Sequence, residues 1–275
     1  MCSLAMTACT SGNEKAGFEG EDLAGKVEIL RDKQTKQAAI RIEVPGAWQV
    51  YAGPSADRID LTEAIAQGNN PGVFTLDVPD SVRSYFQVVT PVGKAIMAER
   101  HLPISGGFNF RDLGGYRNTE GRYVKWGRIL RSDDLHHLTP EDLNYLGSIP
   151  LISVVDFRSA QEMEEAPDRI PTTATGYAAS ITPGNLMSAM DGDMLRPGRA
   201  DSLMREMNRL LVSDPDAIGQ YILLFQLLQN EKEVPLMFHC SAGKDRTGMG
   251  PHWYFMPWEW TMRRLCRTTC CQMST

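Results

Sequence analysis

The chain has 275 residues, a formal net charge of −6 and 42% hydrophobic residues. This length suits one or two domains with a sizeable core, and the near-average composition excludes a wholly disordered or collagen-like chain. The acidic balance argues against broad nucleic-acid binding, which needs a basic face. Because the sequence holds no run of about 18 or more apolar residues, no membrane-spanning helix is expected.

The first nine residues, MCSLAMTAC, are similar to the last part of a bacterial lipoprotein signal, in which small residues precede a lipidated cysteine. Cys9 is therefore a candidate lipid anchor, although the basic start and long apolar core of such a signal are missing. The polar residues 10–22 suit a tether after a lipidated cysteine or an ordinary frayed terminus. The expected location is the periplasm or cell envelope with this anchor, and the cytoplasm without it.

Short segments of alternating apolar and polar residues fill the stretch 26–100 and are separated by turns rich in Pro and Gly. The clearest segments are 38–44, 48–51, 73–78, 85–89 and 94–98. This pattern is typical of a small antiparallel β-sandwich. The stretch has no cluster of Cys, His or carboxylate residues, so a packing or spacer role is expected for it.

After His101, strand-like and helix-like segments alternate. Thr139 is expected to cap a helix that has Pro140 at its first position. Residues 151–156 and 234–238 are expected to form buried strands. A helix between them is expected to bury the face formed by Ile218, Tyr221, Ile222, Phe225 and Leu228. The alternation predicts an α/β fold with a central, mostly parallel sheet flanked by helices.

The second of these strands leads into the sequence HCSAGKDRTG, residues 239–248, which has the spacing Cys-x5-Arg. A tight arc from Cys240 to Arg246 can point its backbone N–H groups inward, and Gly243 permits angles that other residues resist. A helix that begins near Arg246 would aim its positive end at the same centre. Such a site binds a phosphate dianion and stabilises a thiolate. Cys240 is therefore a candidate nucleophile, and Arg246 can grip two phosphate oxygens.

The expected phosphate-binding residues are Ser241, Ala242, Gly243, Lys244, Asp245, Arg246 and Thr247. His239 is expected to support the loop through a hydrogen bond and not to act as the general base. The alternative interpretation makes Cys240 a small apolar core residue beside an ordinary glycine turn. That alternative fits less well, because residue types and spacing agree with one another.

The motif His-Cys-x-x-Gly-x-x-Arg-Thr-Gly resembles the signature of the cysteine-dependent tyrosine phosphatase superfamily. Its Gly-Lys-Asp-Arg variant is similar to atypical bacterial tyrosine phosphatases that also accept phosphoinositides. Further matches to that family lie in order at 109–116, 121–122, 126–133, 154–159, Glu162 and 167–168. Residues 26–100 resemble, more weakly, the appended domain of periplasmic members.

The resemblance implies phosphate-monoester hydrolysis through a phosphocysteine intermediate, without a metal or cofactor. Cys240 would attack phosphorus, and a carboxylic acid would protonate the leaving oxygen. Asp156, which ends a strand and matches the family's Asp-x-Arg step, is ranked above Asp245 as that acid. Asp245 could serve instead or orient the attacking water. Lys244 is either a solvated loop lysine or a recognition residue for a second phosphate or an inositol phosphate.

Other residues of the matched segments are expected to support the site. Asp112 and Asp133 are expected to bind backbone groups in glycine-rich turns, and Arg111 and Arg158 to act as supporting residues. The expected substrate is a protein carrying phosphotyrosine, or alternatively phosphoserine, phosphothreonine or a phosphoinositide. Rival hypotheses are a non-catalytic phospho-ligand binder and a cell-surface interaction protein whose β region does the work.

The sequence after Gly250 departs from the family pattern. Pro251 and Pro257 are expected to break a helix, and three of the five tryptophans fall in this tail. When residues 251–261 are back-translated and read in the frame that starts one nucleotide earlier, the result is the sequence of an apolar helix. We therefore expect that a frameshift near Gly250 has replaced the original ending and impaired the activity. The alternative is a natural divergent ending. The expected organisation is a leader and tether at residues 1–25, then a β-sandwich-like domain at 26–100. A tyrosine-phosphatase-like domain at 101–250 and an aberrant tail at 251–275 follow.

Overall fold

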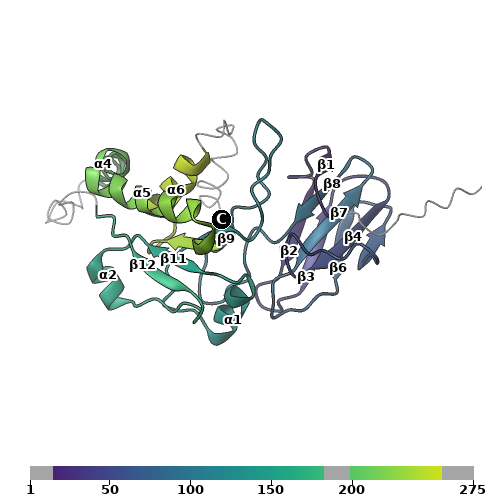
Figure 1. The fold of residues 1–275 in the computed structure, drawn as a ribbon, viewed down its shortest axis with the longest axis horizontal. Coiled ribbons are helices and arrows are strands. Elements are labelled where there is room, and N and C mark those ends of the chain that lie inside the picture. Colours follow the sequence, from purple (N-terminus) through teal and green to yellow (C-terminus); the bar gives the residue numbers. More distant parts are fainter. Residues whose placement is uncertain (1–14, 183–198, 256–275) are drawn as a thin grey trace, which may run out of the picture. The chain divides into compact units, whose positions relative to one another are not determined.

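The computed structural model describes residues 15–182 and 199–255 (Figure 1). The chain divides into two compact units. The described residues of the first unit are 15–30, 38–79 and 84–98, and those of the second unit are 31–37, 80–83, 99–182 and 199–255. The expected boundaries after residues 25, 100 and 250 stay predictions. Among the described helices, none has both the length and the apolar character needed to cross a membrane.

The first unit contains two β-sheets. One sheet has the order β1 (Glu19–Gly20), β8 (Gly93–Met97), β7 (Tyr85–Thr90), β4 (Trp48–Gly53) and β5 (Ala66–Gly68). The other has the order β2 (Val27–Arg31), β3 (Ala38–Ile42) and β6 (Gly72–Leu76). Each of the five alternating segments contains a strand, as predicted. Apolar side chains of both sheets form one core, which includes Ile40, Trp48, Val50, Phe86 and Val88.

The second unit is built on a five-stranded sheet. Its order is β12 (Thr175–Ala178), β11 (Ser153–Asp156), β13 (Leu236–His239), β10 (Ile129–Ser132) and β9 (Arg111–Asp112). The first four strands are parallel, and β9 is antiparallel to β10. Ser132, Asp156 and His239 pair in register at the carboxyl ends of neighbouring strands. The second unit is therefore a mixed α/β structure, as expected, and its loops emerge together at this edge.

Helices cover both faces of this sheet (Figure 1). One face carries α4 (Arg199–Ser213), α5 (Pro215–Gln229) and α6 (Asp245–Phe255). The other carries α1 (Pro140–Ser148) and α2 (Ala160–Glu165). A short 3-10 helix, η1 (Glu231–Glu233), precedes β13. The predicted start of α1 is confirmed, because Thr139 and Asp142 form a capping box around Pro140.

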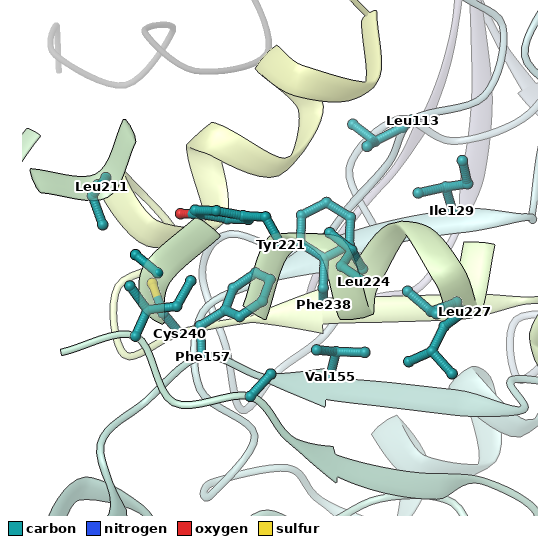
Figure 2. Close-up of a cluster of buried hydrophobic side chains, with 14 of the residues drawn as sticks. Leu113, Ile129, Val155, Phe157, Leu211, Tyr221, Leu224, Leu227, Phe238 and Cys240 are labelled. Carbon is teal, nitrogen blue, oxygen red and sulfur yellow. The ribbon is translucent and has the colours of Figure 1, made fainter. Parts of the chain in front are cut away.

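The buried face of α5 was predicted only in part, because Tyr221 is buried and Phe225 and Leu228 are partly buried against the same core, whereas the two predicted isoleucines are not. Ile218 and Ile222 are 37% and 51% exposed. Most of the circumference of α5 is apolar, so helical spacing alone fits more than one stripe. The buried side chains of α5 are those of Ala217, Tyr221, Leu224 and Leu227. Figure 2 shows three of them beside Val155 and Phe238 of the central strands.

Helix α6 continues through Pro251 to Phe255, so the predicted break at Pro251 is wrong. Proline removes the hydrogen bond to the carbonyl four residues earlier, here that of Thr247, and its ring crowds that carbonyl. A helix can absorb one such interruption as a bend. Residues 1–14 and 256–275 lie outside the described residues, so the lipid anchor at Cys9 and the aberrant tail stay predictions.

Buried ion pairs belong to the second unit and involve its two short early segments, 31–37 and 80–83. Arg31 Nε lies 2.6 Å from Glu99 Oε1, and Arg83 Nη2 lies 2.8 Å from Asp112 Oδ2. All four side chains are fully buried. Since a buried charge without a partner is strongly destabilising, these pairs make both segments part of the second unit's interior.

Candidate active site

The loop of residues 240–246 leaves the carboxyl edge of the central sheet. Strand β13 ends at His239 and α6 begins at Asp245, which confirms the predicted helix start near Arg246. Cys240 is buried, and its side chain belongs to the same core cluster as Phe157 and Tyr221 (Figure 2). A strand, a short loop and a helix N-terminus in succession concentrate backbone N–H groups at one point.

The bend of this loop requires glycine at position 243. Gly243 has a φ of +64°, in the left-handed region that other residues rarely adopt. A Cβ atom there would lie only 2.4 Å from the carbonyl oxygen of Ser132 at the end of β10. The loop therefore lies directly against a neighbouring strand end.

Three groups from outside the loop hold its carbonyl oxygens. Asn109 Nδ2 donates to the oxygens of Ala242 and Gly243 at 3.1 and 2.9 Å. Arg131 Nη2 donates to the oxygen of Gly243 at 2.5 Å, and the N–H of Asp134 to the Ser241 oxygen at 3.3 Å. In a trans peptide the C=O and the next N–H point in opposite directions. The N–H groups of residues 242–244 therefore point away from these anchors, as an anion cradle needs.

Arg131 brings a buried positive charge to this region. The side chain is 1% exposed, and burial together with Arg111 lowers its pKa to about 10. Interaction with Cys240 partly counters that shift. Arg131 therefore remains charged at neutral pH. Arg111, an expected supporting residue, is buried in β9 and pairs in register with Arg131.

Glu162 at α2 holds Arg246 in a two-point ion pair. Arg246 Nη1 and Nη2 lie 2.8 and 2.9 Å from its two carboxylate oxygens. Ser241 Oγ donates to Glu162 and accepts from Arg246 Nη2 at 3.0 Å. The hydrogen bond from Arg246 holds the pKa of Glu162 well below its usual 4.5. Burial alone would lower the pKa of Arg246, but Glu162 and the nearby Cys240 raise it.

These contacts occupy the guanidinium Nη groups that Arg246 was expected to use to bind two phosphate oxygens. Nη1 also donates to the Phe157 carbonyl at 3.3 Å, so both Nη groups already have protein acceptors in the described chain. A two-point grip would need Arg246 to exchange one of these partners. The grip stays a prediction, and the orientation of the guanidinium is set by Glu162.

Asp156 and Arg158 lie side by side in a buried network. Both oxygens of Asp156 accept from Arg158, at 2.8 to 3.0 Å, and Arg158 Nη2 also lies 2.7 Å from Asp168. His239 Nε2 lies 2.9 Å from Asp168 Oδ2, so its ring faces carboxylates and not the loop to which we expected it to bond. Burial alone would raise the pKa of Asp168, but His239 and Arg158 outweigh this effect and lower it.

The same three residues, Asp156, Asp168 and His239, could offer ligand atoms within 4.8 Å of one another to a metal ion. Arg158 already brings a positive charge to both carboxylates. A cation there would be repelled by the guanidinium. An ion-pair network therefore accounts for this group of residues.

The expected structural roles of two aspartates are confirmed. Asp112 accepts from the N–H groups of Gly114 and Gly127, both at 2.7 Å. Asp133 accepts from the N–H groups of Phe108 and Asn109 at 2.9 and 3.1 Å. Each carboxylate therefore fixes a turn by binding two backbone donors that have no helix or sheet partner.

The remaining predicted loop residues differ in exposure. Lys244 is exposed, and Asp245 is half-buried in the first turn of α6. Thr247 is fully buried, and its hydroxyl has no hydrogen-bond partner in the part of the chain that the structure describes. Tyr221 donates from its hydroxyl to the Arg246 carbonyl at 2.8 Å, which ties α5 to the start of α6.

Sequence reasoning gave no site role to Asn109, Arg131, Glu162 or Asp168, although all four lie in the matched segments. A usable signal existed for Arg131, because a charged residue inside a buried strand must find a partner. The other three carry ordinary polar side chains in loops or a short helix. The partners of Asn109 and Glu162 lie far away in sequence, 84 residues in the case of Glu162 and Arg246.

Two named proteins and one family model match this chain. A protein from Cupriavidus necator, provisionally named a tyrosine-protein phosphatase, is 32% identical over 164 residues, which cover 58% of each chain. A tyrosine-protein phosphatase from Nostoc commune is 26% identical over 134 residues, which cover 44% of this chain and 40% of the relative. The chain thus spans about half the length of these relatives. The model of the tyrosine phosphatase family matches residues 102–253, more than half of the chain. The chain therefore belongs to the tyrosine phosphatase family.

Proposed function

We propose that this protein hydrolyses phosphate monoesters, with phosphotyrosine as the first substrate to test, through a phosphocysteine intermediate. The observation that carries the proposal is the loop that starts at Cys240 and has its carbonyl oxygens held on the outside by Asn109, Arg131 and the Asp134 N–H. The tyrosine-phosphatase names of the two relatives support the choice of substrate. Family membership does not favour the rival hypotheses of a non-catalytic binder or a cell-surface interaction protein.

In the proposed first step, the thiolate of Cys240 attacks phosphorus and forms the S–P bond. The bond from phosphorus to the leaving oxygen breaks, and its electron pair stays on that oxygen, which takes a proton from a carboxylic acid. Water then gives a proton to the carboxylate and attacks phosphorus, and the S–P bond breaks, which releases inorganic phosphate and restores both the thiolate and the carboxylic acid. The inward N–H groups of the loop and Arg246 stabilise the charge on the non-bridging oxygens.

The proton donor is proposed to be Asp245, with Asp156 as the alternative. Both oxygens of Asp156 are bonded to Arg158, so proton donation would require that contact to break. Asp245 is half-buried and lies in the loop itself, at the N-terminus of α6. This reverses the order suggested by the sequence, in which the strand end favoured Asp156.

Phosphoserine, phosphothreonine and phosphoinositides are further proposed substrates. The exposed side chain of Lys244 in the loop supports the last of these, because an ammonium group can meet a second phosphate. Turnover of a singly and a doubly phosphorylated inositol, compared between the wild type and Lys244→Met, would test it. If Lys244→Met lowers the turnover of both inositol substrates equally, Lys244 does not recognise the second phosphate.

The decisive test is Cys240→Ser in the full chain. We expect turnover of phenyl phosphate to fall at least about a thousandfold, while binding of inorganic phosphate survives because the cradle is mostly backbone. Acid quenching of the wild type with radiolabelled substrate should trap phosphate on the protein, and the variant should trap none. Turnover near the wild-type rate in Cys240→Ser would remove the cysteine from the mechanism.

The expected impairment by the residues after Gly250 is also a proposal. Replacing residues 251–275 by the shifted-frame sequence should then raise both turnover and the cooperativity of thermal unfolding. Turnover of about 1 per second or faster in the chain as given would instead show that its present ending supports activity.

A further inference from the structure

Two adjoining cavities, of about 610 and 730 Å³, lie on the surface of the first unit. Their linings share Gln49, Val89, Thr90 and Pro91, so the two cavities form one continuous groove. Every residue that lines the groove belongs to the first unit, and none belongs to the candidate phosphatase site. The groove is therefore a feature separate from the loop at Cys240.

The floor of the groove is the outer face of the five-stranded sheet. Trp48 and Val50 of β4 belong to the core of the sandwich, so Gln49 and Tyr51 point to the opposite face of the sheet. The strand register places outward residues directly opposite one another across all five strands. This row consists of Gln67 on β5, Gln49 on β4, Val89 on β7, Lys94 on β8 and Glu19 on β1. The sheet itself thus fixes the spacing of the polar side chains on the floor.

The lining of the groove has little net charge. Lys94 Nζ lies 3.0 Å from the Glu19 carboxylate, so these two charges offset each other. Lys15 is the third charged residue among the residues that line the two cavities. A polyanionic ligand such as a nucleic acid would need several cations along its path. The groove therefore suits a neutral ligand.

Amide groups are the main hydrogen-bonding groups that the groove offers. Gln49, Gln67 and Asn69 all line it and are all exposed. The Tyr51 hydroxyl donates to Gln49 Oε1 at 3.2 Å, which orients that amide and leaves its Nε2 as a donor. An amide offers both donors and an acceptor, and so does each hydroxyl group of a sugar. A row of amides can therefore satisfy the hydroxyl groups of a neutral sugar.

Tyr51 and Leu61 add apolar surface beside these amides, and both side chains are half-buried. A pyranose ring has apolar C–H faces between its hydroxyl groups. A tyrosine ring can pack against such a face while its own hydroxyl keeps a hydrogen-bond partner. An extended peptide fits this floor less well, because the backbone groups under it are already paired between strands.

We propose that this groove binds a neutral oligosaccharide. Gln49 and Gln67 bond to its hydroxyl groups, and Tyr51 packs against one of its rings. Two adjoining cavities match a chain of several sugar rings better than a single ring. This activity goes beyond the proposed phosphatase function and does not depend on it, because the two sites share no residue.

Isothermal titration calorimetry on the full chain tests the proposal with four probes. Cellohexaose, maltohexaose and chitohexaose are neutral, and hexagalacturonate is acidic. We expect at least one neutral probe to bind with a dissociation constant between about 10 µM and 1 mM. The acidic probe should bind more weakly than that neutral probe, because the groove lacks the cations that its carboxylates would need.

Matched variants locate the binding in the groove. Tyr51→Ala and Gln49→Ala should each weaken the bound neutral probe roughly three- to tenfold. Tyr51→Phe should keep most of the affinity, because the ring remains. Gln34→Ala changes an exposed glutamine that lines neither cavity and should leave the affinity unchanged. Since Gln49 is exposed, its replacement tests the groove even if Tyr51→Ala destabilises the sheet.

Three results would overturn the proposal. The first is that no neutral probe binds at about 5 mM, and the second is that neither Tyr51→Ala nor Gln49→Ala weakens binding. The third is preferential binding of hexagalacturonate, which would show that Lys15 and Lys94 select the ligand. The phosphatase proposal is tested separately by turnover of phenyl phosphate, and Cys240→Ser should leave oligosaccharide binding unchanged.

Discussion

Glu162 orients the guanidinium of Arg246, so its charge should matter to both rate and stability. Glu162→Gln keeps the size of the side chain and removes the charge. We expect turnover to fall about ten- to a hundredfold because the arginine is no longer held in one orientation. The matched control is Glu206→Gln, which breaks a surface pair with Arg209 and should leave turnover unchanged.

The same variant has a predicted pH signature. The pKa of Glu162 in the folded chain lies below its usual 4.5. A carboxylate whose pKa is lower in the folded state stabilises the folded chain at pH values above its unfolded-state pKa. This contribution is lost as the pH falls through its folded-state pKa. The difference in unfolding free energy between wild type and Glu162→Gln should therefore be full at neutral pH and shrink below about pH 4.5. Urea unfolding at several pH values would measure it, and a constant difference would contradict the ion-pair assignment.

Leaving-group dependence separates the two candidate acids. If Asp245 donates the proton, Asp245→Asn should slow tyrosine phosphate much more than para-nitrophenyl phosphate, whose leaving group needs little protonation. Asp156→Asn should slow both substrates equally, because it disturbs Arg158 and the network around His239. The opposite pattern would make Asp156 the acid.

At the scale of elements, the tight bend of the Cys-x5-Arg loop makes Gly243 irreplaceable. Gly243→Ala would place a methyl group against the Ser132 carbonyl at a positive φ. We expect turnover to be lost and the unfolding free energy to fall by about 1–3 kcal/mol. Gly219→Ala in α5 is the control, because a Cβ there meets nothing within 4 Å. It should stabilise the helix by about 0.5–1 kcal/mol. Thermal unfolding of both variants would check this contrast.

Elements with local signals could be predicted from the sequence. Period-two patterns located β3 and β7, and Thr139 with Pro140 located the start of α1. The buried face of α5 was predicted only in part, because the sheet and not the helix decides which apolar stripe is covered. The anchoring of Arg246 by Glu162 was missed for a similar reason, since nothing local connects two residues 84 positions apart. Elements with a local sequence signal could thus be predicted, and contacts between residues distant in the sequence could not.

At the scale of the whole molecule, the buried ion pairs should make the early segments essential to the second unit. Arg83→Met would remove the guanidinium that faces the buried charge of Asp112, and Asp112 in turn holds the turn at Gly114. Removing one partner of a buried pair destabilises by about 3–5 kcal/mol. Arg41→Met breaks the exposed pair with Glu28 and should change stability by less than about 1 kcal/mol. Chemical denaturation would measure both, and equal small losses would contradict the buried-pair argument.

The Arg31–Glu99 pair also has a consequence for the order of folding during synthesis. Its two residues are 68 positions apart, and most strands of the first unit lie in the chain between them. Arg31 must therefore stay solvated on the ribosome until Glu99 has emerged. Closing so long a flexible loop is entropically unfavourable, but a first unit that has already folded shortens the effective loop. Early folding of the first unit would then lower the entropic cost of forming the Arg31–Glu99 pair, and so would help the interior of the second unit to form.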